Sequence, residues 1–230
     1  MHDGRRILRL PRQHAGLSVA TALHHVVVEG PIGVGKTSLA RRLAVHFGAE
    51  LLLEQPEANP FLERFYRDIA RYALQTQLAF LFQRVQQMRE LAQLDLFARH
   101  MISDFLLDKD ALFARLTLRD DELKLYEQIH SHLAPRAPTP DLVIYLQADT
   151  HTLIERVSQR ANPREAGITP AYLEALAASY TRFFHHYDAA PLLVVNTEHL
   201  NPIDRDRDFA LLLARIGAMR GRREYFNLAA

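Results

Sequence analysis

The sequence of 230 residues contains no cysteine, which excludes a disulfide framework and thiolate metal sites. It also lacks an excess of charge of one sign, because 28 lysines and arginines face 27 aspartates and glutamates, a formal net charge of +1. This balance gives no general attraction to nucleic acid or to a membrane surface. No apolar run approaches the roughly 20 residues that a membrane-spanning helix needs. We therefore expect a cytoplasmic protein that binds neither nucleic acid nor membrane.

The first 22 residues differ from the rest of the chain in being basic and irregular. They lack the uninterrupted apolar core of a signal peptide, and we expect them to form a disordered leader. The content of apolar residues is 48%, which in a chain of this length suits one domain with a sizeable core. We therefore expect a single domain over residues 23–230.

Short apolar, β-branched runs alternate with longer amphipathic stretches, a pattern typical of an α/β domain with a mostly parallel sheet. Five strands are expected, at residues 25–29, 50–53, 100–103, 142–146 and 192–195. A helix is expected at 36–47, and the long stretch between the second and third strands is predicted to be helical. Apolar residues recur there at intervals of three and four: Leu74, Leu78, Leu81, Phe82, Val85 and Met88. This surface exceeds what one sheet face needs, which favours either a dimer contact or an internal helical layer.

The strongest motif follows the first expected strand and fits G-x-x-x-x-G-K-[ST]: Gly30, Pro31, Ile32, Gly33, Val34, Gly35, Lys36 and Thr37, with Ser38 next. A strand before it and a helical pattern after it are the setting that this phosphate-binding loop requires. Its backbone N–H groups meet phosphate oxygens at the start of the helix. We expect Lys36 to bridge the β- and γ-phosphates and Thr37 to ligate Mg²⁺. The motif thus predicts ATP or GTP binding, which motors, GTPases and kinases share.

Two acidic residues stand at the ends of expected strands, where parallel sheets hold their ligands. Glu54 follows Leu51-Leu52-Leu53, and near a nucleotide it can accept the proton of an attacking hydroxyl. Asp104 follows the third strand, where a carboxylate that holds magnesium belongs. From the residues alone, Glu54 is equally readable as a solvated strand end and Asp104 as a helix N-cap.

These residues and several further segments resemble the deoxynucleoside kinase family, in particular its bacterial deoxyadenosine/deoxyguanosine kinase branch. The likeness runs from about residue 25 to the C-terminus, and its order and spacing make it specific. The segments that carry it, beside the phosphate-binding loop, are Glu54-Gln-Pro, Asn59-Pro-Phe-Leu-Glu-Arg-Phe-Tyr66, Gln75-Thr-Gln77, Phe80-Leu-Phe-Gln-Arg84, Pro140-Asp-Leu-Val-Ile-Tyr-Leu146, and Arg156 with Arg160 before Glu165-Ala-Gly-Ile168. The resemblance and the pattern imply a three-layer α/β P-loop NTPase fold, with a five-stranded, mostly parallel sheet, flanking helices and a lid at about 160–168.

The resemblance also implies roles for individual residues. Glu54 would be the general base for a 5′-hydroxyl, and Tyr66 with Glu165 would hold the 3′-hydroxyl of the deoxyribose. The nucleobase would meet Gln77, Arg84 and Phe113. Gln77 and Arg84 are seven residues apart, which on a helix places them on one face about 10 Å from each other. A solvated helix edge is the alternative for this pair.

The sequence has three arginines near the expected lid but lacks one arginine that family members carry. Arg156, Arg160 and Arg164 cluster around the expected lid, where they can stabilise charge on the transferring phosphoryl group. The alternative is a favourable interaction with a helix end. Family members commonly carry Arg-Ser after the acid of the third strand, whereas here Phe105 follows Asp104. Lys109 or Arg164 is the candidate to supply the missing charge.

The leading hypothesis is ATP-dependent 5′-phosphorylation of a deoxynucleoside, with purines favoured and Mg²⁺ held by Thr37 and Asp104. Lys36, Glu54, Arg156 and Arg160 would be the catalytic residues. The resemblance further suggests a homodimer through the long helices. Two alternatives remain open: a nucleoside monophosphate kinase of the thymidylate kinase type, and an ATP-binding regulatory module with impaired catalysis.

Overall fold

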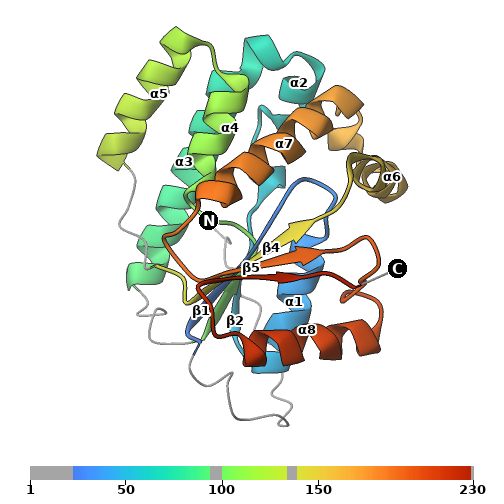
Figure 1. The fold of residues 1–230 in the computed structure, drawn as a ribbon. Coiled ribbons are helices and arrows are strands. Elements are labelled where there is room, and N and C mark those ends of the chain that lie inside the picture. The colour runs from blue at the N-terminus through green and yellow to red at the C-terminus, as the bar shows by residue number, and fades with distance from the viewer. Residues whose placement is uncertain (1–22, 94–99, 134–138, 229–230) are drawn as a thin grey trace, which may run out of the picture.

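The computed structural model describes residues 23–93, 100–133 and 139–228, shown as a coloured ribbon in Figure 1. The expected leader at residues 1–22 lies outside these described ranges. No helix within them is both long enough and apolar enough to cross a membrane.

The centre of the molecule is a parallel sheet whose strands run in the spatial order β2-β3-β1-β4-β5-β6. The strands are β1 (His25–Glu29), β2 (Glu50–Leu52), β3 (Met101–Ser103), β4 (Leu142–Gln147), β5 (Leu192–Asn196) and β6 (Arg223–Phe226). The five expected strands are confirmed, but the prediction of a five-stranded sheet was wrong. The sixth strand was missed because Arg-Glu-Tyr-Phe at a sheet edge is only partly buried and lacks a β-branched run.

Alternate side chains of the strands enter two separate cores, because successive residues of a strand point to opposite faces. Val26 and Val28 pack with α1 (Lys36–Phe47) and α8 (Asp206–Ala218) on one face of the sheet. Val27 packs into the core on the other face. Both faces of these strands are therefore covered, which explains their nearly continuous apolar sequences.

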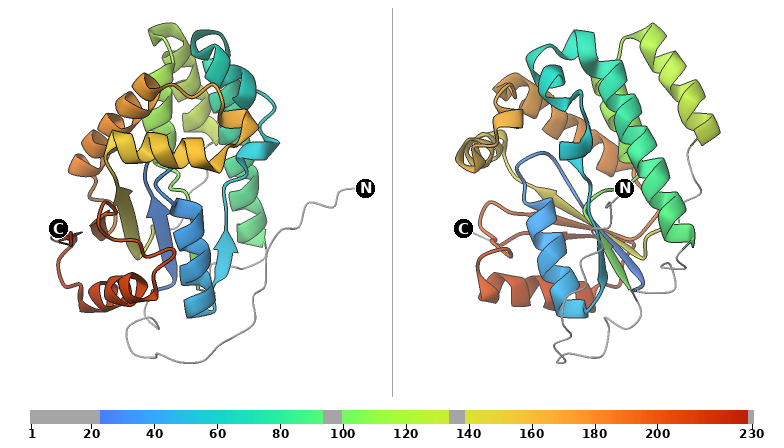
Figure 2. Two further views of the ribbon diagram at one scale, coloured as in Figure 1. Left: turned by 90° about the vertical axis from the view of Figure 1, so that its right-hand side faces the viewer. Right: turned by 180° about the vertical axis from the view of Figure 1, so that it is seen from behind.

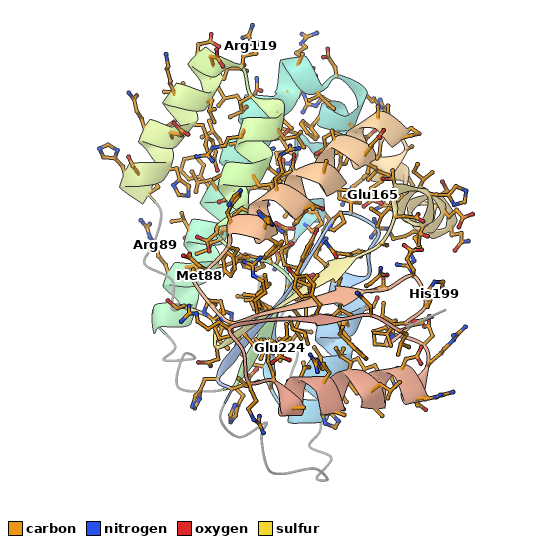
Figure 3. The ribbon with its side chains drawn as sticks, viewed as in Figure 1. Met88, Arg89, Arg119, Glu165, His199 and Glu224 are labelled. Atoms are coloured by element: carbon orange, nitrogen blue, oxygen red, sulfur yellow. The ribbon has the colours of Figure 1, made fainter. Side chains whose placement is uncertain are left out.

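Helices cover both faces of the sheet, as Figures 1 and 2 show, so the three-layer α/β fold is confirmed. The second face carries α2 (Leu62–Arg67), α3 (Ile69–Gln93), α4 (Lys109–Thr117), α5 (Asp120–Leu133) and α7 (Pro170–His186). Figure 3 shows side chains filling the space between the sheet and the helices on either side. The chain also forms α6 (Thr150–Arg160) and two 3₁₀ turns, Pro56–Ala58 and Pro163–Glu165.

Local sequence sets where several helices begin. The Asp149 carboxylate accepts the backbone N–H of Thr152 at 2.7 Å, which caps α6. The Thr169 hydroxyl accepts from Tyr172 N at 3.2 Å before α7, and Pro170 stands at its first position. The long stretch predicted as helical is divided at Asp68, whose carboxylate accepts from Arg71 N at 3.2 Å.

The apolar stripe predicted on the long helix α3 is buried over Leu81, Val85 and Met88. Phe82 is the exception, because 55% of it is exposed to solvent. The core of the second face accounts for most of the stripe, which favours the internal helical layer at those positions. Phe82 stays available for a contact outside the monomer.

Candidate active site

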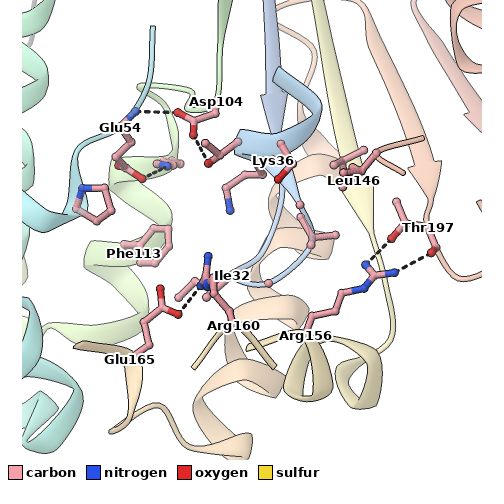
Figure 4. A pocket seen from close by; sticks show the side chains of 18 of the residues that line it. Ile32, Lys36, Glu54, Asp104, Phe113, Leu146, Arg156, Arg160, Glu165 and Thr197 are labelled. Carbon is pink, nitrogen blue, oxygen red and sulfur yellow. Dashed lines mark hydrogen bonds and ion pairs between the residues drawn. The ribbon is translucent and has the colours of Figure 1, made fainter. Parts of the chain in front are cut away.

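A cavity of about 510 Å³ opens where the parallel strands end, at their carboxyl edge. The chain passes from β1 to β2 and β3 on one side of it and then crosses from β3 to β4 on its other side, and this reversal creates a crevice at the end of β1. The loops after β1, β2, β3 and β5 all contribute to the lining. Figure 4 shows Lys36 in the middle, with Glu54 and Asp104 on one side and Arg156 on the other.

The phosphate-binding loop adopts the shape that its glycines allow. Gly35 has φ of 101° and caps α1, and a Cβ there would collide with the side chain of Ile203. A side chain at this position would meet both backbone strain and that collision, so only glycine fits. All residues from Ile32 to Ser38 line the cavity.

Lys36 lies at the base of the loop and forms no ion pair with a carboxylate of the described residues. Its Nζ donates to the carbonyl oxygens of Gly30 at 2.7 Å and Pro31 at 3.1 Å. Loss of hydration lowers the pKa of Lys36, an effect that the nearby Glu29 carboxylate opposes. The Lys36 ammonium group is thus poorly hydrated and hydrogen-bonded to backbone carbonyl oxygens. In this position it can bind an anionic phosphate.

Thr37 and Asp104 meet across the cavity floor. The Thr37 hydroxyl donates to Asp104 Oδ2 at 2.5 Å, and the backbone N–H of Glu54 donates to Asp104 Oδ1 at 2.8 Å. Burial raises the pKa of Asp104, although these hydrogen bonds oppose the effect. A hydroxyl and a carboxylate in contact beside the phosphate loop are the oxygen ligands that Mg²⁺ accepts.

The carboxylate of Glu54 is held by two cations from different helices. Oε1 accepts from the Arg84 guanidinium of α3, and Oε2 accepts from Lys109 Nζ of α4 at 3.0 Å. Burial alone would raise the pKa of Glu54, but Lys109 and Arg84 together lower it to about 2. The low pKa keeps Glu54 ionised at neutral pH. Its side chain is only 20% exposed and has two cationic partners, so it is not a solvated strand-end residue.

The helix α3 carries the expected polar pair inward. Gln77 is 3% exposed and Arg84 is 4% exposed, so the alternative of a solvated helix edge was wrong. Arg84 also donates to Asp110, a buried residue of α4 that the sequence reasoning did not single out. Gln77 and Phe113 line the same cavity as Arg84. The Gln77 amide nitrogen donates to Thr117 Oγ1 at 3.4 Å.

Tyr66, Arg160 and Glu165 line the cavity at the segment that was predicted to form a lid. The Arg160 guanidinium donates to the Glu165 carboxylate, as Figure 4 shows. Burial, followed by the proximity of Tyr172 and Glu165, raises the pKa of Tyr66 well above its ordinary value. Gly167 packs on the backbone of Tyr66, where a Cβ would lie 2.8 Å from the carbonyl carbon and oxygen.

The three arginines around the lid have different surroundings. Arg156 donates to Thr197 Oγ1 and to the Thr197 carbonyl oxygen, each at 3.1 Å. Arg156 and Arg160 line the cavity, whereas Arg164 is exposed and lies outside the lining. Of the two candidates for the missing positive charge, Lys109 is therefore the one that lines the cavity, where it contacts Glu54.

Sequence reasoning did not single out several other residues at this site. The buried Glu29 at the end of β1 looks like an ordinary part of the strand-to-loop junction in the sequence. Asp110 follows Lys109 directly and lacks a motif of its own. The loop after β5 contributes four residues to the lining, namely Asn201, Pro202, Ile203 and Asp204. An acidic residue that directly follows the apolar run Val26-Val27-Val28 is the signal that points to Glu29.

The fold and this cavity define a phosphotransferase of the P-loop class, with a phosphate-binding loop and the half-buried carboxylate of Glu54 in one cavity. The model of the deoxynucleoside kinase family matches residues 26–218. The chain is 35% identical over 191 residues to the deoxyguanosine kinase of Bacillus subtilis, covering 81% of this chain and 89% of that one. The chain therefore belongs to the deoxynucleoside kinase family.

Other relatives agree with this membership. A deoxyadenosine kinase of Lactobacillus acidophilus is 28% identical over 190 residues, which cover 76% of this chain and 86% of that one. The fold matches the structure of a deoxyadenosine kinase from M. mycoides with a TM-score of 0.74, at 24% identity and over 85% of this chain and 100% of the other. The protein is thus an enzyme that phosphorylates deoxynucleosides, and the findings do not favour a thymidylate-type kinase or a regulatory module.

Proposed function

We propose that the enzyme transfers the γ-phosphate of ATP to the 5′-hydroxyl of a purine deoxynucleoside, yielding the monophosphate and ADP. The observation that carries this proposal is the placement of ionised Glu54 in the same cavity as the phosphate-binding loop. A neutral hydroxyl must lose a proton when it attacks phosphorus, and a carboxylate on the acceptor side can receive it.

The proposed donor-binding residues are those of the phosphate-binding loop: Gly30, Pro31, Ile32, Gly33, Val34, Gly35, Lys36, Thr37 and Ser38, of which Ile32 to Ser38 line the cavity. In the proposal the backbone N–H groups of the residues that line the cavity and the Lys36 side chain hold the β- and γ-phosphates. Arg156 and the loop after β5 lie beside them, where the nucleoside part of ATP fits. Thr37 and Asp104 would hold Mg²⁺, which neutralises charge on the phosphates when bound.

On the acceptor side, Glu54 receives the proton of the 5′-hydroxyl as its oxygen bonds to the γ-phosphorus and the bond to ADP breaks. A carboxylate with a pKa near 2 is a weak base, so the proton leaves only as the new P–O bond forms. Lys109, Lys36, Arg156 and Arg160 stabilise the negative charge around the transferring group. Lys109 thereby takes the place of the arginine absent after Asp104.

The proposed sugar site is the cluster of Tyr66 and Glu165, which would hold the 3′-hydroxyl. The segment at about 160–168 would act as a lid, since it carries Arg160 and Glu165 on the same side of the cavity. Closing a lid over the substrate excludes water from the transfer step.

The proposed base site is formed by Gln77, Arg84 and Phe113, which line the cavity, and the buried Asp110 accepts a hydrogen bond from Arg84. The Gln77 amide offers a donor and an acceptor to a base edge and Arg84 offers donors, with the ring of Phe113 beside them. Purine preference is supported by the relatives, which include the deoxyguanosine kinase of B. subtilis and the deoxyadenosine kinase of L. acidophilus.

We further propose a cytoplasmic homodimer that contacts neither nucleic acid nor membrane. Phe82 on α3 and Leu125 on α5 are exposed by 55% and 46%, respectively, and α3 contacts α5 in the fold. Large exposed apolar side chains on adjacent helices are a common feature of subunit interfaces. The near-neutral net charge of +1 supports the absence of a nucleic-acid partner.

Product analysis with γ-labelled ATP and Mg²⁺ tests the reaction. With deoxyadenosine we expect label only in the 5′-monophosphate, and with 2′,5′-dideoxyadenosine, which lacks the acceptor hydroxyl, we expect none. Label transferred to deoxynucleoside monophosphates but not to deoxynucleosides would overturn the proposal.

A further inference from the structure

Glu29 is an acidic residue in a position where an apolar one is expected. It is the last residue of β1, it directly precedes the phosphate-binding loop, and none of its surface is exposed. The strand before it is an uninterrupted valine run, as is usual for a parallel strand covered on both faces. A buried carboxylate is costly unless charged and polar partners satisfy it, so its presence requires an explanation.

The carboxylate of Glu29 connects segments that surround the transfer site. Oε1 accepts from the backbone N–H of Gly30 at 2.9 Å and from the Tyr180 hydroxyl of α7 at 3.0 Å. Oε2 accepts from the backbone N–H of Leu106, in the segment between β3 and α4, at 2.8 Å. The same oxygen lies 3.7 Å from Lys109 Nζ.

Lys109 consequently lies between two carboxylates. Its side chain is 3% exposed, and its Nζ is 3.0 Å from Glu54 Oε2 and 3.7 Å from Glu29 Oε2. Lys109 is the first residue of α4, and Glu29 also binds the segment that leads into this helix. A lysine side chain has four rotatable bonds, so a single partner at Glu54 would leave its position less defined than two partners do.

We propose that Glu29 is a positioning residue for phosphoryl transfer: it holds the Lys109 ammonium beside Glu54 and joins it to the first amide of the phosphate-binding loop. This inference goes beyond the proposed function but rests on its assignment of Lys109 and Glu54. Glu29 itself touches neither substrate in this account. It acts by fixing the distance between the acceptor-side cation and the loop that holds the donor.

A double-mutant cycle tests this role with Glu29→Gln, Lys109→Met and the double variant. Misplacing a catalytic group by about 1 Å lowers the rate on the order of 100-fold. We expect Glu29→Gln to lower kcat by about 10- to 100-fold with less than about threefold change in KM for either substrate. We expect the double variant to match Lys109→Met, because Glu29 has nothing left to position once the ammonium is gone.

The control is Asp141→Asn, which alters a carboxylate that directly precedes β4 and contacts the opposite end of β1 from Glu29. Asp141 Oδ2 accepts the backbone N–H groups of His24 and His25, at 2.6 and 2.8 Å. This residue has a structural role outside the cavity, so we expect its loss to affect thermal unfolding and leave kcat within about twofold. Should Glu29→Gln fail to fold, Glu29→Asp, which keeps the charge but shortens the side chain, enters the cycle instead.

If the losses in kcat of the two single variants multiply in the double variant, the positioning role is wrong. It is also wrong if Glu29→Gln has the same kcat as the wild type. A wild-type enzyme without activity on deoxynucleosides would instead overturn the proposed function. A Lys109→Met variant with full activity would overturn the assignment of Lys109, and the inference about Glu29 would fall with it.

Discussion

Glu54 is the proposed general base. Each of its carboxylate oxygens contacts a different buried cation, Arg84 or Lys109. Replacing it with glutamine preserves the shape of the side chain but removes its capacity to take a proton. We expect Glu54→Gln to lower kcat by about 10²- to 10⁴-fold on deoxynucleosides. Steady-state assays measure this, and Glu57→Gln, an exposed residue three positions on, is the matched control. An unchanged kcat in Glu54→Gln would show that another group takes the proton.

Lys109 controls the acidity of that carboxylate. The pKa of Glu54 is lowered from 4.5 to about 2, so the stability that its ionised form contributes is present above pH 4.5 and is lost as pH falls toward 2. In Lys109→Met, the larger of the two leading opposing charges is gone while Arg84 remains, and the pKa of Glu54 rises. We therefore expect an acid limb in kcat/KM at a higher pH than in the wild type.

The pH profile is measured from pH 3 to 8 with saturating ATP and Mg²⁺. Lys124→Met, which removes an exposed lysine of α5, serves as the control and should keep the wild-type profile. Superimposable profiles for Lys109→Met and the wild type would contradict the proposed pairing with Glu54.

Among the elements, the lid segment depends on one close backbone approach. Gly167 lies so near the Tyr66 backbone that an added Cβ would come within 2.8 Å of it. We expect Gly167→Ala to displace Glu165 from Tyr66 and to lower kcat/KM for deoxynucleosides about 10- to 100-fold, by misplacing the sugar site. Gly221→Ala is the control, because a Cβ there meets its neighbours at 3.4 Å or more.

A substrate comparison separates this effect from general damage. A 2′,3′-dideoxynucleoside lacks the hydroxyl that Tyr66 and Glu165 are proposed to hold. The relative loss in Gly167→Ala should therefore be much smaller with this analogue than with the deoxynucleoside. Equal losses with both substrates would place the effect of Gly167 elsewhere.

The elements also show which parts of the molecule are predictable from sequence. The phosphate-binding loop is recognisable because its glycines and lysine are contiguous, and Asp104 because a short apolar run precedes it. The contacts of Glu54 with Arg84 and Lys109 join β2, α3 and α4, and no local pattern specifies that meeting. β6 was missed because its backbone pairing with β5, rather than an apolar sequence, makes it a strand.

At the scale of the whole molecule, the proposed dimer predicts a monomeric variant. Phe82→Glu places a charge on the exposed apolar surface of α3, and burying it at an interface would be strongly unfavourable. We expect sedimentation at micromolar concentration to show a dimer for the wild type and a monomer for this variant. Leu211→Glu, at a residue 37% exposed on α8, should stay dimeric. A monomeric wild type would contradict the proposal.

Purine preference in this cavity is tested by kcat/KM for the four natural deoxynucleosides, measured with γ-labelled ATP and Mg²⁺. We expect the largest value for deoxyguanosine or deoxyadenosine, with the label at the 5′ position. A larger kcat/KM for deoxycytidine or thymidine would contradict it.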